Sequence, residues 1–438
     1  MDMLEVLDGQ EDCLHLHVYV PNTTTPKQEN KKLPIIFWIH GGGFFAGSGS
    51  PKAYGPEHFM DYDVILVAIN YRVGPLAFLT LENDLMPGNL GIHDQILALK
   101  WTQDNIEYFG GDPGKVTIMG ESAGAMSVMY LMMSEQAKDL FHGAIIQSGP
   151  IISSYTHWDK QPHVYTIRLA QDLGCKNVKD NKKIVDCLRK IDAFTYANHT
   201  KHFLHYPWIG PNVWKPYVDG TSDDISNPLF MDEPINLLKT GQFNKVPVII
   251  GTNSDEGAIN SIGFLDGRAS FDEINDSWND SIGPLILFHR SFDETMEEDK
   301  EMAKNIKEMY FQQENISKQN LNEFIKLSGD HMFYGGTELV VEELNKNNVT
   351  TFRYMYNHKG TVTLPDIFLL NRMVFLGKLA GSYLTGGWKM VDLDMGVCHS
   401  DEIFVMFRPQ AIPINILISE ADKRASQRIL SYYANFAT

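Results

Sequence analysis

The sequence has no long hydrophobic run. No stretch approaches the roughly 18 consecutive apolar residues that a membrane-spanning helix needs, so we predict no membrane span. The first eight residues, Met-Asp-Met-Leu-Glu-Val-Leu-Asp, contain neither a basic region nor an apolar one. The chain as written therefore has no predicted signal peptide.

Basic charge is also scarce. The chain has 37 Lys and Arg against 55 Asp and Glu, which gives a formal net charge of -18. A surface of this sign repels phosphate backbones, so we predict no nucleic-acid partner. Charge and composition leave the oligomeric state open.

Cysteines are few, and none has metal-ligand spacing. We therefore predict no metal site and no cofactor. Of the four cysteines, Cys175 and Cys187 flank a polar, lysine-rich stretch. A disulfide between them would close a small loop. Cys13 and Cys398 have no obvious partners in the sequence.

Sequons for asparagine glycosylation are frequent, in contrast to the missing signal peptide. Several sequons in one chain fit a secreted, glycosylated protein better than a cytosolic one. The sequons thus predict an extracellular location, and the missing signal peptide argues against it. The candidate acceptors are Asn22, Asn198, Asn275, Asn279, Asn315 and Asn348.

Short apolar runs rich in β-branched residues recur through the first 250 residues. Such nearly continuous runs predict strands that are covered on both faces of a parallel sheet. Helical patterns at 92–109 and 123–133 lie between some of them, so the sequence predicts a doubly wound α/β sheet. The predicted strands are 16–20, 35–39, 64–69, 116–119, 144–146 and 246–250.

From about residue 264 to residue 344 the sequence becomes charged and rich in Met and Glu. This segment predicts helices laid over the sheet, and 351–356 returns to the strand pattern. No repeat, low-complexity tract or Pro/Gly/Ser linker marks a domain boundary. We therefore predict a single domain over 1–438, with a helical segment at about 264–344.

The central chemical signal is Gly-Glu-Ser-Ala-Gly at 120–124. It follows a predicted strand and precedes a predicted helix, which is the context of a nucleophile elbow. The glycines allow a strained turn that exposes the hydroxyl of Ser122 above the sheet. The motif alone is weak, because it also arises by chance, and the strand–turn–helix context strengthens it.

A glycine-rich turn at 40–43, His-Gly-Gly-Gly, directly follows the predicted strand at 35–39. Esterases and lipases use such a turn to aim backbone N–H groups at the oxyanion of a tetrahedral intermediate. Gly42, Gly43 and Ala123 are the candidate donors. A phosphate cradle is disfavoured, because no Gly-Lys-Ser/Thr follows.

A serine nucleophile needs a base, and the base needs an acid to orient it. In this fold class the chain order is serine, acid, histidine. Glu256 is the best acid because it follows the predicted strand 246–250, but position alone does not separate it from Asp255. His399 is the best base, in a glycine-containing loop, while His331 and His358 also lie after the acid.

Together these motifs resemble the type-B carboxylesterase and cholinesterase family, in an insect-esterase-like version. The resemblance runs from about Glu11 to the end of the chain. It implies an α/β-hydrolase fold, a small-molecule ester as substrate, Ser122, Glu256 and His399 as triad, and Gly42, Gly43 and Ala123 as oxyanion hole. It also favours Glu256 over Asp255. The matching segments are 11–18, 70–74, 88–91, 109–124, 147–149 and 255–257.

The sequence also departs from the family pattern. The family has a further segment before residue 11, including a signal peptide and a cysteine that would pair with Cys13, and it continues beyond residue 438. The resemblance therefore implies a chain truncated at both ends. Juvenile hormone esterases typically have Gln before the nucleophile, where this chain has Glu121. The resemblance therefore implies neither juvenile hormone nor a choline ester as the substrate.

Three functional hypotheses follow. The first is a serine carboxylic ester hydrolase. The second is a non-catalytic adhesion or recognition protein on the same fold, and the third is a damaged enzyme fragment. Family members of the second kind usually lack the serine, whereas Ser122, Glu256 and His399 are all present here. The sequence therefore favours the hydrolase.

Overall fold

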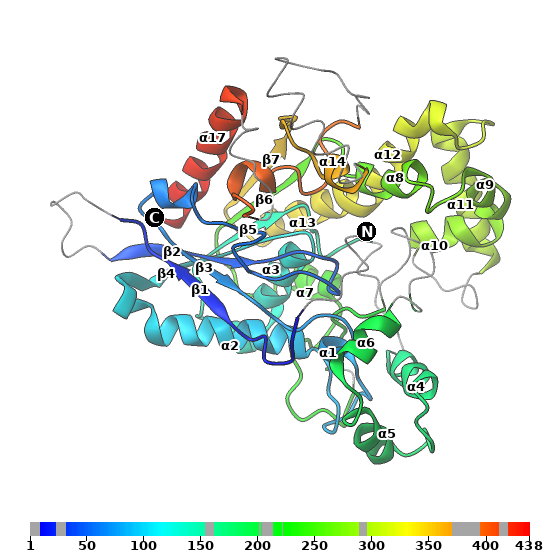
Figure 1. Ribbon diagram of the computed structural model, residues 1–438, viewed down its shortest axis with the longest axis horizontal. Helices are drawn as coiled ribbons and strands as arrows, with labels where there is room; N and C mark the ends of the chain where they lie inside the picture. Colours follow the sequence, from blue (N-terminus) through cyan, green and yellow to red (C-terminus); the bar gives the residue numbers. More distant parts are fainter. Residues whose placement is uncertain are drawn as a thin grey trace.

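A twisted sheet forms the centre of the computed structural model, which describes residues 9–22, 32–153, 162–200, 203, 213–220, 222–288, 296–369, 395–410 and 419–438. The sheet has seven strands in the order β1-β3-β2-β4-β5-β6-β7 (Figure 1). Its first pair, β1 with β3, is antiparallel, and all other pairs are parallel. The strands are β1 Leu16–Tyr19, β2 Leu33–Ile39, β3 Ile65–Ile69, β4 Gly111–Glu121, β5 Gly143–Gln147, β6 Val248–Asn253 and β7 Thr351–Tyr356.

Each strand predicted from the sequence is present, so the α/β fold class is confirmed. The boundaries differ where pairing extends a strand beyond its apolar run. β4 begins at Gly111, because Leu33 of β2 pairs with that residue. β6 reaches Asn253, because Asn253 pairs with Tyr356 of β7. Polar residues at these strand ends therefore belong to the sheet, although hydrophobicity alone did not include them.

The central strands β2, β3, β5 and β6 are buried on both faces, as their continuous apolar runs predicted, whereas the edge strands β1 and β7 are partly exposed. Side chains alternate along a strand, so Ile35 and Phe37 of β2 join one core while Ile36 and Trp38 join the other. Helices α2 (Leu90–Asn105) and α3 (Ala123–Met133) cover the first face, and α16 (Ile403–Met406) and α17 (Glu420–Ala437) cover the second. Figure 1 shows α2 and α17 on opposite sides of the sheet.

The helical segment packs beside the sheet and has a hydrophobic cluster of its own around Trp278 and Phe324. Two single π-helical turns interrupt it, η7 (Trp278–Ile282) and η9 (Asp330–Tyr334). Its helices are α8 Ala258–Leu265, α9 Phe271–Ser277, α10 Gly283–Phe288, α11 Glu297–Phe311, α12 Leu321–Gly329 and α13 Gly335–Lys346. The segment predicted at 264–344 is therefore helical, and the assignment of the chain to one domain stays a prediction.

Shorter helices complete the described chain. The α-helices are α1 Pro75–Phe78, α4 His163–Asp172, α5 Asn181–Leu188, α6 Ala193–Thr200, α7 Pro234–Thr240 and α14 Leu364–Leu369. The single 3-10 turns are η2 Phe59–Asp61, η3 Ile106–Phe109, η4 Glu135–Ala137 and η8 Lys318–Asn320. Within the described ranges, no helix is both long enough and apolar enough to cross a membrane.

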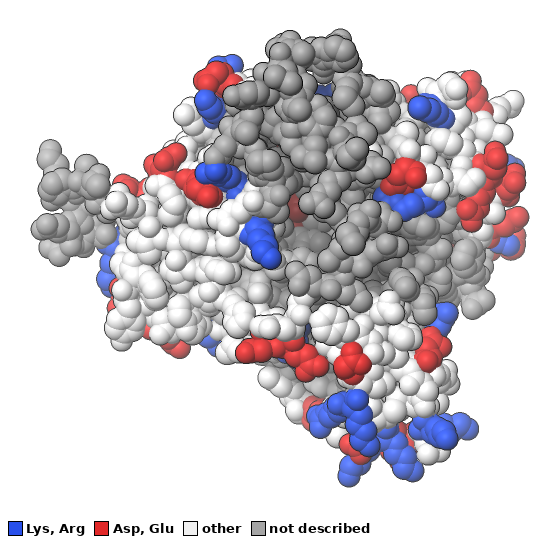
Figure 2. All heavy atoms as spheres, viewed as in Figure 1, with Lys and Arg blue, Asp and Glu red and all other residues white. Residues whose placement is uncertain are grey.

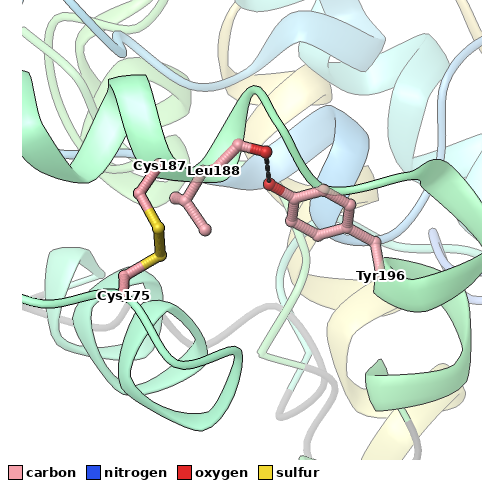
Figure 3. Close-up of a disulfide and its surroundings, with 4 residues drawn as sticks. All are labelled: Cys175, Cys187, Leu188 and Tyr196. Carbon is pink, nitrogen blue, oxygen red and sulfur yellow. Dashed lines mark hydrogen bonds between the residues drawn. A yellow bond between two sulfur atoms is a disulfide. The ribbon is translucent and has the colours of Figure 1, made fainter.

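A small lobe built from α4, α5 and α6 carries the predicted disulfide. Cys175 and Cys187 are bonded, with their Cα atoms 5.9 Å apart, so this prediction is confirmed (Figure 3). Next to the disulfide, the hydroxyl of Tyr196 donates to the carbonyl of Leu188 at 2.6 Å. Figure 2 shows Lys and Arg side chains gathered on this lobe, although the chain as a whole is acidic.

The sequon asparagines differ in how their amides are used. Five of them are exposed: Asn22, Asn198, Asn279, Asn315 and Asn348. Asn275 is half-buried, and its Nδ2 donates to the carbonyls of Phe271 and Ile316 at 2.7 and 2.8 Å. A glycan on Asn275 would replace one of these two hydrogens. Glycosylation of the six positions stays a prediction.

Candidate active site

The Gly-Glu-Ser-Ala-Gly motif forms a sharp turn between β4 and α3. Ser122 is the N-cap of α3, with φ 57° and ψ -125°. A non-glycine residue in such a sparsely populated conformation costs about 1–3 kcal/mol, so the surrounding structure must hold it there. One restraint is the Ser122 N–H, which donates to the carbonyl of Gln147 at the end of β5 at 2.9 Å.

Two close backbone contacts explain the glycines of this motif. A Cβ on Gly120 would lie 2.4 Å from the carbonyl carbon of Gly124. A Cβ on Gly124 would lie 2.1 Å from the carbonyl oxygen of Ile39 in β2. Only glycine lets α3 start this close to β4 and β2. Close packing therefore requires glycine at both positions of the motif, and this packing fixes the position of Ser122.

The glycine-rich turn after β2 lies directly against Ser122. A Cβ on Gly41 would be 3.1 Å from Ser122 Cβ. Gly42 and Gly43 have φ of 110° and 61°, values that favour glycine. Ala123 is the first residue of α3, so its N–H has no acceptor within the helix. The two turns that carry the predicted oxyanion donors therefore contact each other at Gly41 and Ser122.

The acid candidate and the base candidate are in direct contact. Glu256 is fully buried just beyond β6, and its Oε2 accepts a hydrogen bond from His399 Nδ1 at 2.7 Å. Its Oε1 accepts from the N–H of Asn253 at 2.6 Å. Both carboxylate oxygens are therefore held. With Nδ1 as the donor to Glu256, Nε2 of His399 is the nitrogen that can take a proton.

The rival acid and one rival base are engaged elsewhere. The Oδ2 atom of Asp255 accepts from the N–H of Val397 at 2.9 Å and from the hydroxyl of Ser254 at 2.6 Å. Asp255 thus supports the loop that carries His399. His358 Nε2 bonds to Asp422 on α17 at 2.7 Å. Of the two adjacent acids, Glu256 is the one that contacts His399.

Glu121, which precedes Ser122, also reaches His399. Its Oε1 lies 3.2 Å from His399 Nε2 and accepts from the hydroxyl of Ser400 at 2.5 Å. The Ser122 hydroxyl makes no hydrogen bond with any residue that the structure describes. In this structure Nε2 of His399 therefore contacts Glu121 and makes no hydrogen bond with Ser122. The hydrogen bond between a nucleophile and its base often tightens only when substrate is bound.

Several buried carboxyl groups set the electrostatics around His399. Burial alone lowers the pKa of His399, but Glu121 and then Glu256 outweigh it and raise this pKa to about 9. Burial raises the pKa of Glu121 above its ordinary value. Burial, followed by the charges of Glu121 and Glu256, raises the pKa of Glu402 to about 8. The site therefore favours a protonated imidazole.

Two further side chains support the loop that carries His399, and the sequence reasoning gave them no role. Asp401 accepts from the N–H groups of Leu364 and Cys398 at 2.7 and 2.8 Å. The Nδ2 atom of Asn253 donates to the carbonyl of Cys398 at 2.8 Å and to Glu402 Oε2 at 2.6 Å. The only signal available in the sequence was their place beside Glu256 and His399.

Comparison with known proteins places this chain in a family. The model of the carboxylesterase family matches residues 2–438. The chain is 33% identical to the juvenile hormone esterase of Tribolium castaneum, over 98% of this chain and 70% of that protein. It is 32% identical to venom carboxylesterase-6 of Apis mellifera, over 98% and 71% of the two chains. It is 35% identical to esterase FE4 of Myzus persicae, over 82% and 62%. The chain therefore belongs to the carboxylesterase family and is a carboxylic ester hydrolase.

Proposed function

We propose that the chain hydrolyses esters through an acyl-enzyme, with Ser122 as nucleophile, His399 as base and Glu256 as the orienting acid. The observation that carries this proposal is the 2.7 Å hydrogen bond between Glu256 and His399, whose Nε2 lies beside the strained Ser122 turn. A serine hydroxyl is a poor nucleophile near neutral pH, so it needs a base of this kind.

In the proposed reaction, Ser122 attacks the ester carbonyl while its proton passes to His399 Nε2. The N–H groups of Gly42, Gly43 and Ala123 stabilise the oxyanion, and each such donor is worth on the order of 3 kcal/mol in the transition state. His399 then gives the proton to the leaving alcohol. Water attacks the acyl-enzyme by the same route and regenerates Ser122.

The proposed substrates are small carboxylic esters. The names of the relatives refer to different substrates, because one is a juvenile hormone esterase and another is an acetylcholinesterase. Their similarity to this chain therefore does not select one ester. A hydrolysis screen over nitrophenyl esters of increasing acyl length would define the preferred acyl group.

Labelling with a fluorophosphonate, followed by peptide mapping, tests the nucleophile. Ser148 offers a matched control, because it also has a positive φ, 54°, and directly follows the neighbouring strand β5. We expect the label on Ser122, loss of labelling and activity in Ser122→Ala, and normal labelling in Ser148→Ala. A label on Ser148, or on any other serine, would overturn the assignment.

A further inference from the structure

The π-helical turn η9 lies against the pair formed by Glu256 and His399. Phe333 is buried, and its ring centroid is 4.8 Å from that of His399. The next residue, Tyr334, has its hydroxyl within hydrogen-bonding distance of two backbone groups at the end of β6. Consecutive residues of one turn thus contact the base and the loop that carries the acid.

The Tyr334 hydroxyl closes the turn that carries Glu256. It accepts from the N–H of Glu256 at 3.2 Å and donates to the carbonyl of Asn253 at 2.9 Å. Across the same turn, the Glu256 side chain accepts from the N–H of Asn253 at 2.6 Å. The turn is therefore fixed by its own carboxylate on one side and by Tyr334 on the other. Burial raises the pKa of Tyr334, so the hydroxyl keeps the proton that it donates.

Close packing restricts the contact between Tyr334 and the turn that carries Glu256. A Cβ on Gly257 would lie 2.0 Å from the carbonyl oxygen of Ile325 in α12, so the helical segment touches the acid turn. A Cβ on Gly329 would lie 2.9 Å from the Tyr334 ring. An extra residue in a helical turn changes the direction of the side chains that follow, and π turns often occur at functional sites.

We propose that Tyr334 is a positioning residue, which holds the backbone of Glu256 so that its carboxylate meets His399 Nδ1 in the reactive geometry. The inference rests on the proposed triad. The hydroxyl acts through Glu256 and does not touch the reacting atoms. A displacement of about 1 Å in a reacting group can lower the rate by on the order of 10²-fold, so a loosened acid turn affects kcat more than KM.

Tyr334→Phe removes the hydroxyl and keeps the ring. Tyr310→Phe is the matched control, because the Tyr310 hydroxyl donates to Asp330 Oδ2, in the same π turn, at 2.7 Å. We expect Tyr334→Phe to lower kcat about 10- to 100-fold at unchanged KM. Tyr310→Phe should keep kcat within about twofold, because the Tyr310 hydroxyl does not contact the acid turn. This should hold even if Tyr310→Phe lowers the melting temperature as much as Tyr334→Phe does.

A double-mutant cycle separates positioning from a general structural role. If Tyr334 acts through Glu256, then Tyr334→Phe should have little further effect on kcat in a Glu256→Gln background. Equal losses in Tyr334→Phe and Tyr310→Phe, additive losses in the cycle, or unchanged kcat in folded Tyr334→Phe would overturn the proposal. Failure of the triad itself would appear separately, as fluorophosphonate labelling away from Ser122.

Discussion

The two sides of the active site are built by different means. On the side of the nucleophile, Ser122 is placed by backbone contacts between β2, β4 and α3, and glycines permit these contacts. On the side of the acid and the base, side-chain hydrogen bonds place Glu256 and His399. Glu256 bonds the N–H of Asn253 and the hydroxyl of Tyr334, and His399 bonds Glu256. Both sides join segments that are distant in the chain, the first by close backbone packing at glycines and the second by side-chain hydrogen bonds.

This difference determines how each side responds to change. An added methyl group on the nucleophile side must displace backbone atoms, which are rigid. A lost hydrogen bond on the other side leaves the fold in place and changes the orientation or the protonation of His399. We therefore expect glycine substitutions to test the first side, and isosteric polar substitutions to test the second.

The largest expected effect concerns the acid. Glu256→Gln keeps the size of the side chain but favours the wrong imidazole tautomer, so kcat should fall by about 10⁴-fold, by analogy with other triads. Asp255→Asn should retain substantial turnover, because Asp255 contacts Val397 and Ser254 and not His399. Steady-state kinetics on folded protein with one ester measures both variants. The reverse ranking would move the acid to Asp255.

The next effect concerns the glycine-rich turn. A Cβ on Gly42 would lie 2.2 Å from the carbonyl oxygen of Ala46, so Gly42→Ala must displace the turn. We expect kcat to fall by about 10²- to 10³-fold, as when one oxyanion donor is lost. Gly110→Ala is the control, because Gly110 also has a positive φ, 81°, but has open space around it. Equal losses of kcat in both variants would assign the effect to backbone strain alone.

The disulfide lobe should affect stability without affecting chemistry. Replacing Cys175 and Cys187 together by Ser should lower the free energy of unfolding by about 3 kcal/mol, since the bond closes a short loop. The kcat of the folded protein should not change, because no triad residue lies in this lobe. Chemical denaturation and kinetics measure the two quantities. Cys13→Ser, at a free cysteine, is the control for the substitution itself.

The smallest effect is a change in pH dependence. His399 must be neutral to accept a proton, and Glu121 contributes to raising its pKa to about 9. Glu121→Gln removes this charge, so the acidic limb of kcat/KM should move to lower pH, by about one unit. The groups that face His399 also include Glu256 and Glu402.

Glu402→Gln provides a comparison for this prediction. Glu402 raises the pKa of His399 less than Glu121 does. The acidic limb should therefore move less in Glu402→Gln than in Glu121→Gln. A limb that stays in place in Glu121→Gln would show that Glu121 does not set the protonation of His399. A pH profile of kcat/KM with one nitrophenyl ester measures both variants.

The sequence by itself determined the strand order along the chain, the elbow at Ser122 and the glycine turn. These features depend on residues close together in the chain, where apolar runs and glycines act locally. Sequence position left Glu256 and Asp255 unresolved until the family resemblance favoured one. Neighbouring residues at a strand end face different directions, and only their partners distinguish them.

Only the tertiary structure shows the contact between Glu256 and His399, and it brings Glu121, Ser400, Asp401 and Tyr334 to the turns that carry them. Glu256 and His399 are 143 positions apart, and Tyr334 lies 81 positions from Asn253. No periodicity or spacing predicts such contacts. They depend on how α12, η9 and the loop before α16 pack against the ends of β4 and β6. A buried carboxylate takes its role from the donors that reach it, and the fold supplies those donors.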